Sequence, residues 1–252
     1  GPSGNQWYLA SVLEHPHLVE YSTSTGILRS ADLGATWNDY GTAQDFIMES
    51  DSAFTIGHGR EKMHDFEVAP DFAQSGELQF CRAEGLYYSR NEGELWQRRT
   101  FRPTSQVRGL DCFINSNGEL IGAAGCYGSG TWLQNTISGD VQMLRNGSSS
   151  YVDEIELSPR FAEDGMMLVG GARGLALWFD PALAAPNPYQ VWGWKIIPMS
   201  ANLGYVRAFA LSPNFDARGT PGTDQIFMFS SSSAAQSNFL TTDCGQTFEE
   251  LN

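Results

Sequence analysis

The sequence predicts an all-β fold made of about five repeated units of four strands each, and three observations lead to it. An eight-residue turn pattern occurs three times, and a strand that ends at a proline recurs between these turns. No stretch has a helical spacing of apolar residues that is long enough to indicate a helix. Four-stranded units repeated in this way are the blades of a β-propeller. We therefore expect a single β-propeller domain over residues 1–252.

The turn pattern has a hydroxyl residue first, Asp or Asn third, Gly fifth and an aromatic residue eighth, over 30–37, 89–96 and 241–248. The Asp or Asn side chain bonds to backbone N–H groups that follow it, and Gly supplies the positive φ that closes the turn. The aromatic residue begins the returning strand and folds back over the turn. The pattern therefore predicts hairpins whose turns are held by Ser30, Asp32, Gly34, Trp37, Ser89, Asn91, Gly93, Trp96, Asp243, Gly245 and Phe248.

The second repeat is an apolar-alternating strand that ends at a proline in three of its four copies. Proline cannot donate to a sheet ladder, so it marks the end of the strand. The copy without proline turns at 116–118 instead. The equivalent apolar residues are separated by roughly 44, 45 and 54 residues, which is the period of a four-stranded blade. These residues are Phe66, Leu110, Ile155 and Phe209.

Turn signals divide the units into short strands. In the second unit we expect strands at 65–69, 77–82, 85–89 and 95–101, and in the fourth at 153–158, 166–170, 175–179 and 189–197. The five units, in order, are expected to cover approximately 7–40, 64–101, 107–145, 152–197 and 205–251.

Composition excludes several functions. The formal net charge is -14, with 29 acidic against 15 basic residues, so a partner that must be held by its phosphates is excluded and we expect no nucleic acid. No apolar stretch reaches the roughly 18 residues of a membrane span, so we expect no membrane insertion. The chain has neither a signal peptide nor an initiator Met, and we expect a mature or trimmed product.

The four cysteines have no C-x-x-C spacing, which argues against a zinc site. A bridge between Cys81 and Cys112 and a set of buried free thiols are both open interpretations. His15 and His17 lie on one side of an extended segment but lack further ligands at a recognisable spacing. We expect no metal and no cofactor.

The start of the recurring strand carries the candidate site. Equivalent positions of successive blades meet around a propeller axis, so these residues are expected to ring one mouth of its channel. They either bind a ligand or pair with one another to line a watery channel, and we favour pairing. The mouth residues are His64, Asp65, Arg108, Asp153, Glu154 and Arg207, with a deeper acidic arc of Glu67, Asp111 and Glu156 that is a candidate cation site.

Trp192 and Trp194 alternate along an expected outer strand and share a face there. They either form an aromatic platform for a sugar or protein or pack against the next blade, which is the ordinary interpretation.

The turn pattern resembles the Asp-box, or BNR repeat, S-x-D-x-G-x-T-W. The copy at 30–37 matches every position, the second departs at Asn91 and Leu95, and the third has Thr241 and Phe248. Together with the element Ser-Pro-x-Phe-Ala-x-Asp-Gly at 158–165, the turns look like those of bacterial extracellular BNR proteins of the sortilin or Vps10-like type. Relatives with Asp-boxes include sialidases, xyloglucan-cleaving glycosidases, lectins and adhesion proteins. The resemblance implies a secreted or surface-exposed propeller whose Asp-box residues are structural.

Two functions follow. A sialidase of this type has an early Arg-Ile-Pro motif, whereas the nearest string here, 101–103, lacks the Ile and follows the second turn. Because no nucleophile, acid or cofactor motif is present, we favour a non-catalytic extracellular or cell-surface module that binds a protein or glycan, or is a subunit of a larger surface assembly. The alternative is a glycoside hydrolase or lyase that uses carboxylates at the channel mouth.

Overall fold

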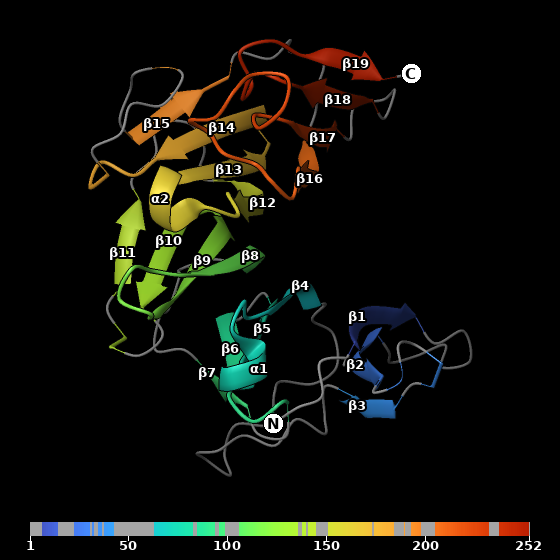
Figure 1. Cartoon of the computed structure of the whole chain (residues 1–252). Coiled ribbons are helices and arrows are strands. Elements are labelled where there is room, and N and C mark those ends of the chain that lie inside the picture. Colours follow the sequence, from blue (N-terminus) through green and yellow to red (C-terminus); the bar gives the residue numbers. More distant parts are fainter. Residues whose placement is uncertain are drawn as a thin grey trace. The chain divides into compact units, whose positions relative to one another are not determined.

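The structure is a computed structural model, and its described residues are almost entirely β. They form nineteen strands and two short helices, arranged in five antiparallel sheets (Figure 1). The described residues are 7–14, 23–30, 32, 35–36, 38–42, 63–82, 85–93, 96–98, 106–135, 138–139, 141–144, 151–172, 174–183, 189, 193–197, 205–231 and 237–251.

The chain divides into two compact units, Gly1–Val107 and Arg108–Asn252. Each is described by itself below. The expectation of one continuous domain over the whole chain stays a prediction.

Unit 1 contains two sheets whose strands pair in chain order, as in a meander. The second sheet has a one-turn helix, α1 (Phe72–Ser75), between its first two strands. The first sheet has three strands among the described residues and the second has four. The first consists of β1 (Trp7–Glu14), β2 (Thr23–Ser30) and β3 (Asn38–Thr42), and the second of β4 (Met63–Val68), β5 (Leu78–Arg82), β6 (Gly85–Ser89) and β7 (Gln97–Arg98).

Unit 2 contains three sheets of four strands, again in chain order, and the first strand of the third sheet begins two residues before the unit boundary. Helix α2 (Phe161–Asp164) is a single turn between the first two strands of the fourth sheet. The third sheet consists of β8 (Gln106–Ile114), β9 (Leu120–Tyr127), β10 (Gly130–Asn135) and β11 (Val141–Leu144). The fourth consists of β12 (Val152–Leu157), β13 (Met166–Gly171), β14 (Gly174–Phe179) and β15 (Gly193–Ile196). The fifth consists of β16 (Val206–Leu211), β17 (Phe227–Ser231), β18 (Asn238–Thr241) and β19 (Glu249–Leu251).

The core of unit 2 lies between successive sheets. One buried cluster joins the fourth and fifth sheets, and another joins the third and fourth. Burial of this apolar surface is what holds neighbouring sheets together. The first cluster includes Met166, Leu168, Leu177, Phe179, Val206, Phe215, Phe227 and Phe229, and the second includes Ala123, Leu144, Val152, Ile155, Met167 and Val169.

The turn pattern forms the hairpins that the sequence predicts, and it connects β2 to β3, β6 to β7 and β18 to β19. In the third copy, Oδ1 of Asp243 accepts hydrogen bonds from Thr241 Oγ1 at 2.8 Å and from the backbone N of Thr247 at 2.9 Å. Oδ2 accepts a hydrogen bond from Thr247 Oγ1 at 2.6 Å. Asp32 makes equivalent bonds to Ser30 and Thr36. Each carboxylate therefore holds both sides of its turn.

The aromatic residues at the eighth position pack into the sheets. Trp96 is buried, with its ring 4.7 Å from that of Phe80 on β5. Phe248 packs edge-on against Phe227 and Phe229 of β17. Gly34 and Trp37 of the first copy lie outside the described residues.

The positive φ of these turns is shared between two residues. Gly93 and Gly245 have φ of 94° and 82°, but the residues before them, Glu92 and Cys244, are also positive, at 60° and 56°. The sequence predicted only the glycines. A non-glycine residue in this conformation is uncommon. Here the turn is stabilised because the backbone N–H of Gly93 donates a hydrogen bond to Ser89 Oγ, and that of Gly245 donates one to Thr241 Oγ1.

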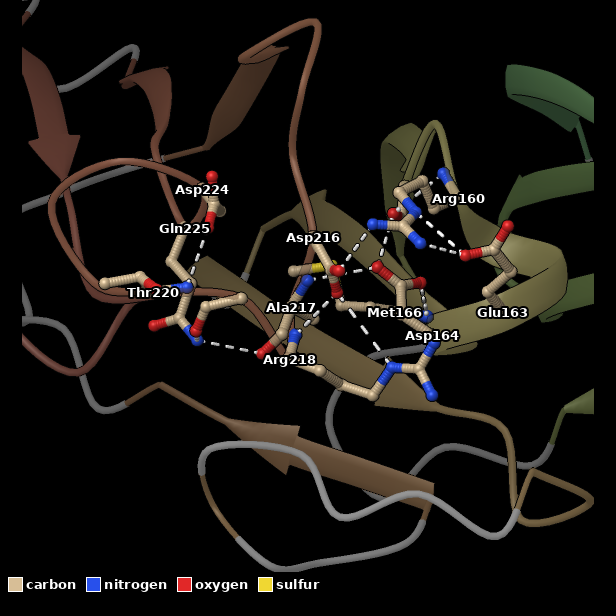
Figure 2. A network of polar contacts seen from close by, with 12 residues as sticks. Arg160, Glu163, Asp164, Met166, Asp216, Ala217, Arg218, Thr220, Asp224 and Gln225 are labelled. Carbon is tan, nitrogen blue, oxygen red and sulfur yellow. Dashed lines mark hydrogen bonds and ion pairs between the residues drawn. The ribbon is translucent and has the colours of Figure 1, made fainter.

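Polar contacts join α2 to the loop between β16 and β17 (Figure 2). Asp164 is buried and accepts hydrogen bonds from Ser158 Oγ at 2.6 Å, from the backbone N of Met166 at 3.0 Å and from the backbone N of Ala217 at 3.1 Å. Arg160 Nη1 lies 2.7 Å from Asp216 Oδ2. The segment that follows the proline-ended strand of the fourth sheet therefore also binds the loop between the first two strands of the fifth sheet.

Candidate functional site

Two candidate site residues of unit 2, Asp153 and Arg207, lie at irregularities in their sheets. On β12, Val152 pairs with Gly171 and Glu154 with Gly170, so that Asp153 between them has no partner on β13. This is a β-bulge, a feature that redirects a side chain and recurs beside binding sites.

The same irregularity recurs at the equivalent position of two other sheets. On β16, Val206 pairs with Ser231 and Ala208 with Ser230, which leaves Arg207 as the extra residue. On β4 of unit 1, the shift between Met63 and Asp65 leaves His64 as the extra residue. The sequence alignment placed Asp153, Arg207 and His64 at one position, and the register assigns all three to the same type of bulge.

The sequence contains a signal for these bulges that the prediction did not use. Val152 and Ile155 are both buried, although they are three residues apart. Residues of a regular strand share a face only at even spacing, so two buried residues at an odd spacing require an extra residue between them. Val107 and Leu110 have the same spacing and are also both buried.

In unit 2 the two bulge residues, Asp153 and Arg207, meet Arg108 in a charged cluster. Arg108 Nη1 lies 2.7 Å from Asp153 Oδ1, and Arg207 Nη1 lies 3.9 Å from the same oxygen. The side chain of Asp153 is 3% exposed, that of Arg108 26% and that of Arg207 49%. The second oxygen of Asp153, Oδ2, is buried and has no hydrogen-bond partner among the described residues. One buried carboxylate therefore faces two guanidinium groups, one hydrogen-bonded and one not.

Tyrosine rings support both arginines. The guanidinium carbon of Arg108 lies 4.2 Å from the ring centroid of Tyr127, and that of Arg207 lies 4.9 Å from the centroid of Tyr205. Tyr151 packs at 4.6 Å against Tyr127 and is 40% exposed. We call these six residues the arginine–tyrosine cluster: Arg108, Tyr127, Tyr151, Asp153, Tyr205 and Arg207.

The sequence did not predict the three tyrosines. Tyr127 ends β9, and Tyr151 meets it through an isolated bridge just before β12. Neither residue belongs to the aligned repeat, so no pattern in the sequence links them to Arg108. Tyr205 lies two residues before Arg207, and this spacing is the one signal that would have suggested it.

The predicted acidic arc includes a residue with a structural role. Oδ2 of Asp111 accepts a hydrogen bond from the backbone N of Leu157 at 2.6 Å, and its Oδ1 accepts one from Cys112 N at 2.6 Å. Asp111 therefore links β8 to β12 of the next sheet. Glu154 and Glu156 are half-buried on β12.

The remaining mouth residues lie in unit 1. His64 is exposed, Asp65 and Glu67 are half-buried, and Asp65 Oδ1 accepts a hydrogen bond from the backbone N of Phe66 at 2.9 Å. That these three share one mouth with Arg108, Asp153 and Arg207 stays a prediction.

The predicted aromatic platform is described in part. Trp194 is half-buried on β15, and its ring packs 5.2 Å from that of Trp178 on β14. The two residues are cross-strand partners within the fourth sheet, so the choice between a platform and packing against the next blade stays a prediction. Trp192 lies outside the described residues.

Within the described ranges, no three His, Cys, Asp or Glu side chains are grouped as metal ligands. The helices described are single turns, and neither has the length and apolar character of a membrane-spanning helix. All four cysteines are buried free thiols.

Comparison with solved structures identifies the fold. The chain is similar to an ancestral GH74 enzyme, with a TM-score of 0.62 and 14% identity over 99% of this chain and 30% of that one. It is also similar to YCF48 bound to D1 peptide, with a TM-score of 0.49 and 16% identity over 90% of this chain and 60% of that one. The chain thus spans less than two thirds of the length of either. No protein-family model and no curated protein sequence matches it.

The likeness to the GH74 enzyme confirms the predicted fold class. The chain is an all-β protein with a β-propeller fold, and its sheets of three or four antiparallel strands are the blades.

Proposed function

We propose that this chain is a non-catalytic, extracellular or cell-surface binding module, and that it holds a protein or glycan partner at the arginine–tyrosine cluster. The observation that carries the proposal is the environment of Asp153. Its carboxylate is buried and ion-paired with Arg108 at 2.7 Å, and Arg207 Nη1 lies 3.9 Å from the same oxygen.

A carboxylate in this environment is suited to orienting arginines. A glycoside hydrolase uses two carboxyl groups on either side of the scissile bond, and one of them must protonate the leaving oxygen. Oδ1 of Asp153 already accepts a charge-assisted hydrogen bond from Arg108 Nη1 at 2.7 Å. Asp111, the acid at the next inner strand, is committed to backbone N–H groups. These commitments support binding over hydrolysis.

The composition of the cluster is that of a recognition surface. Tyrosine and arginine are enriched among the residues that dominate binding energy, because they combine a large apolar area with directional polar groups. Tyr151 and Arg207 are the exposed members, and they lie against the rings of Tyr127 and Tyr205, respectively.

The hairpin turns support the extracellular assignment. Asp32 and Asp243 make equivalent hydrogen bonds in their turns, and the same pattern defines the Asp-box. We infer a relationship to secreted Asp-box proteins, in which these turns are structural, and we propose that the module serves in a surface assembly.

The alternative function is that of a glycoside hydrolase or lyase, in which carboxylates near Asp153 cleave a glycan. The test measures product release from a panel of glycans by the wild-type chain and by the variants Asp153→Ala and Glu154→Ala. We expect binding without turnover. If the wild type turns over a glycan and either variant loses that activity, the chain is a glycosidase or lyase and the proposal of a binding module is wrong.

A further inference from the structure

We propose that Arg207 is the anchor for the side-chain carboxylate of an Asp or Glu on a protein partner. The inference rests on the proposed function, since it specifies what the arginine–tyrosine cluster binds.

Arg207 is available for a ligand, whereas Arg108 is not. Its guanidinium is half-exposed and lies 3.9 Å from Asp153, which is beyond hydrogen-bond distance. Tyr205 lies against it at 4.9 Å and orients it without using its N–H donors. Arg108 instead uses Nη1 on Asp153 and is stacked on Tyr127. Among the residues that the structure describes, Arg207 has the 3.9 Å ion pair with Asp153 and no hydrogen bond, so its N–H donors can bind an external carboxylate.

The planar donor fork of arginine matches a carboxylate, which accepts two parallel hydrogen bonds. The charged members of the arginine–tyrosine cluster, Arg108, Asp153 and Arg207, together carry an excess of one positive charge, which favours a ligand with one negative charge. The chain as a whole has a formal net charge of -14, which repels a strongly acidic partner at long range. The partner segment should therefore present one carboxylate among neutral or basic residues.

The surroundings of Arg207 favour a protein segment. Tyr151 offers an exposed ring on the same cluster, and Tyr and Arg pairs of this kind are typical of the centre of protein interfaces. A sugar acid would use the same arginine, and the experiment distinguishes the two.

The test is an NMR titration of the ¹⁵N-labelled chain with the peptide acetyl-Lys-Gly-Glu-Gly-Lys-amide. Its twin has Gln in place of Glu, and the methyl glycoside of glucuronic acid is the sugar arm. We expect the Glu peptide to shift the side-chain Nε–H signal of Arg207 and to bind at least about tenfold more tightly than its Gln twin, because the charge-assisted pair is lost in the twin.

Three variants complete the design. Arg207→Gln should weaken Glu-peptide binding by about tenfold or more, and Arg207→Lys should recover part of it, because lysine keeps the charge but loses the fork. The matched control is Lys195→Gln, which removes a cation that also lies over a tyrosine, Tyr189, but on the outer strand β15. It should leave binding unchanged. The backbone spectrum of each variant reports whether it is folded.

Equal binding of the Glu and Gln peptides would overturn the inference, and so would equal losses in Arg207→Gln and Lys195→Gln. Binding of the glucuronide without the peptide would overturn the assignment of a protein partner. These outcomes are independent of glycan turnover, which tests the proposed function separately.

Discussion

Val152 of β12 occupies the space that a side chain at Gly125 of β9 would need, since a Cβ atom on Gly125 would lie 2.4 Å from Cγ1 of Val152. The next pair of sheets repeats the relationship, because a Cβ atom on Gly170 of β13 would lie 2.7 Å from Cγ1 of Val206. Each valine directly precedes a bulge residue. This interlock of neighbouring sheets therefore fixes the backbone that presents Asp153 and Arg207.

Gly125→Ala should destabilise the fold by overpacking this contact. Insertion of a methyl group into a tight interior contact lowers the free energy of unfolding by about 1–3 kcal/mol. Urea unfolding measures the change. The control is the double variant Gly125→Ala with Val152→Ala, in which the space is restored, and its loss should be smaller than the sum of the two single losses. Strict additivity would show that the two residues do not contact each other.

The carboxyl group of Asp32 should titrate at about 2. Hydrogen bonds from the side chain and backbone N–H of Thr36, and then from Ser30, lower its pKa from the usual 3.8. Because the folded pKa lies below the unfolded value, its stabilising contribution is complete above pH 3.8 and is lost as the pH falls toward 2.

A ¹³C NMR titration of the Asp32 carboxyl carbon measures this pKa directly. Thr36→Val, which removes the hydroxyl donor, should move it back toward 3.8. In unfolding experiments at neutral pH, Asp32→Asn should have a lower free energy of unfolding than the wild type. The difference between these two free energies should become smaller as the pH falls. A wild-type Asp32 that titrates at its ordinary value would refute the hydrogen-bonding described for the turn.

Asp164→Ala should loosen the junction of the fourth and fifth sheets. Burial raises the pKa of Asp164, and the hydrogen bonds from Ser158, Met166 and Ala217 oppose that rise. Removal of the acceptor leaves these donors unsatisfied, at a cost of about 1–3 kcal/mol. Urea unfolding gives the loss, and hydrogen exchange at the Ala217 amide should accelerate. Glu163→Ala, which removes an exposed partner of Arg160, should cost less than about 1 kcal/mol. Similar losses in the two variants would contradict the role of Asp164.

The cysteine thiols should be unreactive in the folded chain. All four are buried, and desolvation raises the pKa of Cys126 to about 12 although Ser129 donates a hydrogen bond that lowers it. Burial also raises the pKa of Cys244, and the nearby charges of Asp164, Asp243 and Asp216 add to the effect. Iodoacetamide at pH 8 should label none of them in the native state and all of them in urea. Rapid labelling of native Cys126 would show that it is accessible.

The repeated turns made the blades predictable, because their hydrogen bonds are local in sequence. The strand expected at 153–158 corresponds to β12 at Val152–Leu157. The strand expected at 189–197 is β15 at Gly193–Ile196, and the described residues Tyr189 and Ile197 lie outside it. An outer strand pairs on one side only, so its length depends on hydrogen bonds that composition does not reveal.

The site was predictable only where it follows the repeat. Arg108, Asp153 and Arg207 occupy equivalent positions of three strands, so alignment identified them. The bulges at Asp153 and Arg207 were missed because the odd spacing of buried residues was not considered. The contact of Tyr127 with Tyr151 was not predictable, because it depends on how two sheets pack and not on either segment alone.

The central claim is that Asp153 is held in an ion pair that orients the arginines, and a double-mutant cycle tests it most directly. The free energy of unfolding is measured for the wild type, Arg108→Gln, Asp153→Asn and the double variant. Either single variant leaves a partly buried charge without its partner, so the double variant should be more stable than the sum of the single losses predicts, with a coupling of at least about 1 kcal/mol. A coupling of zero would mean that Arg108 does not hold Asp153, and it would contradict the account.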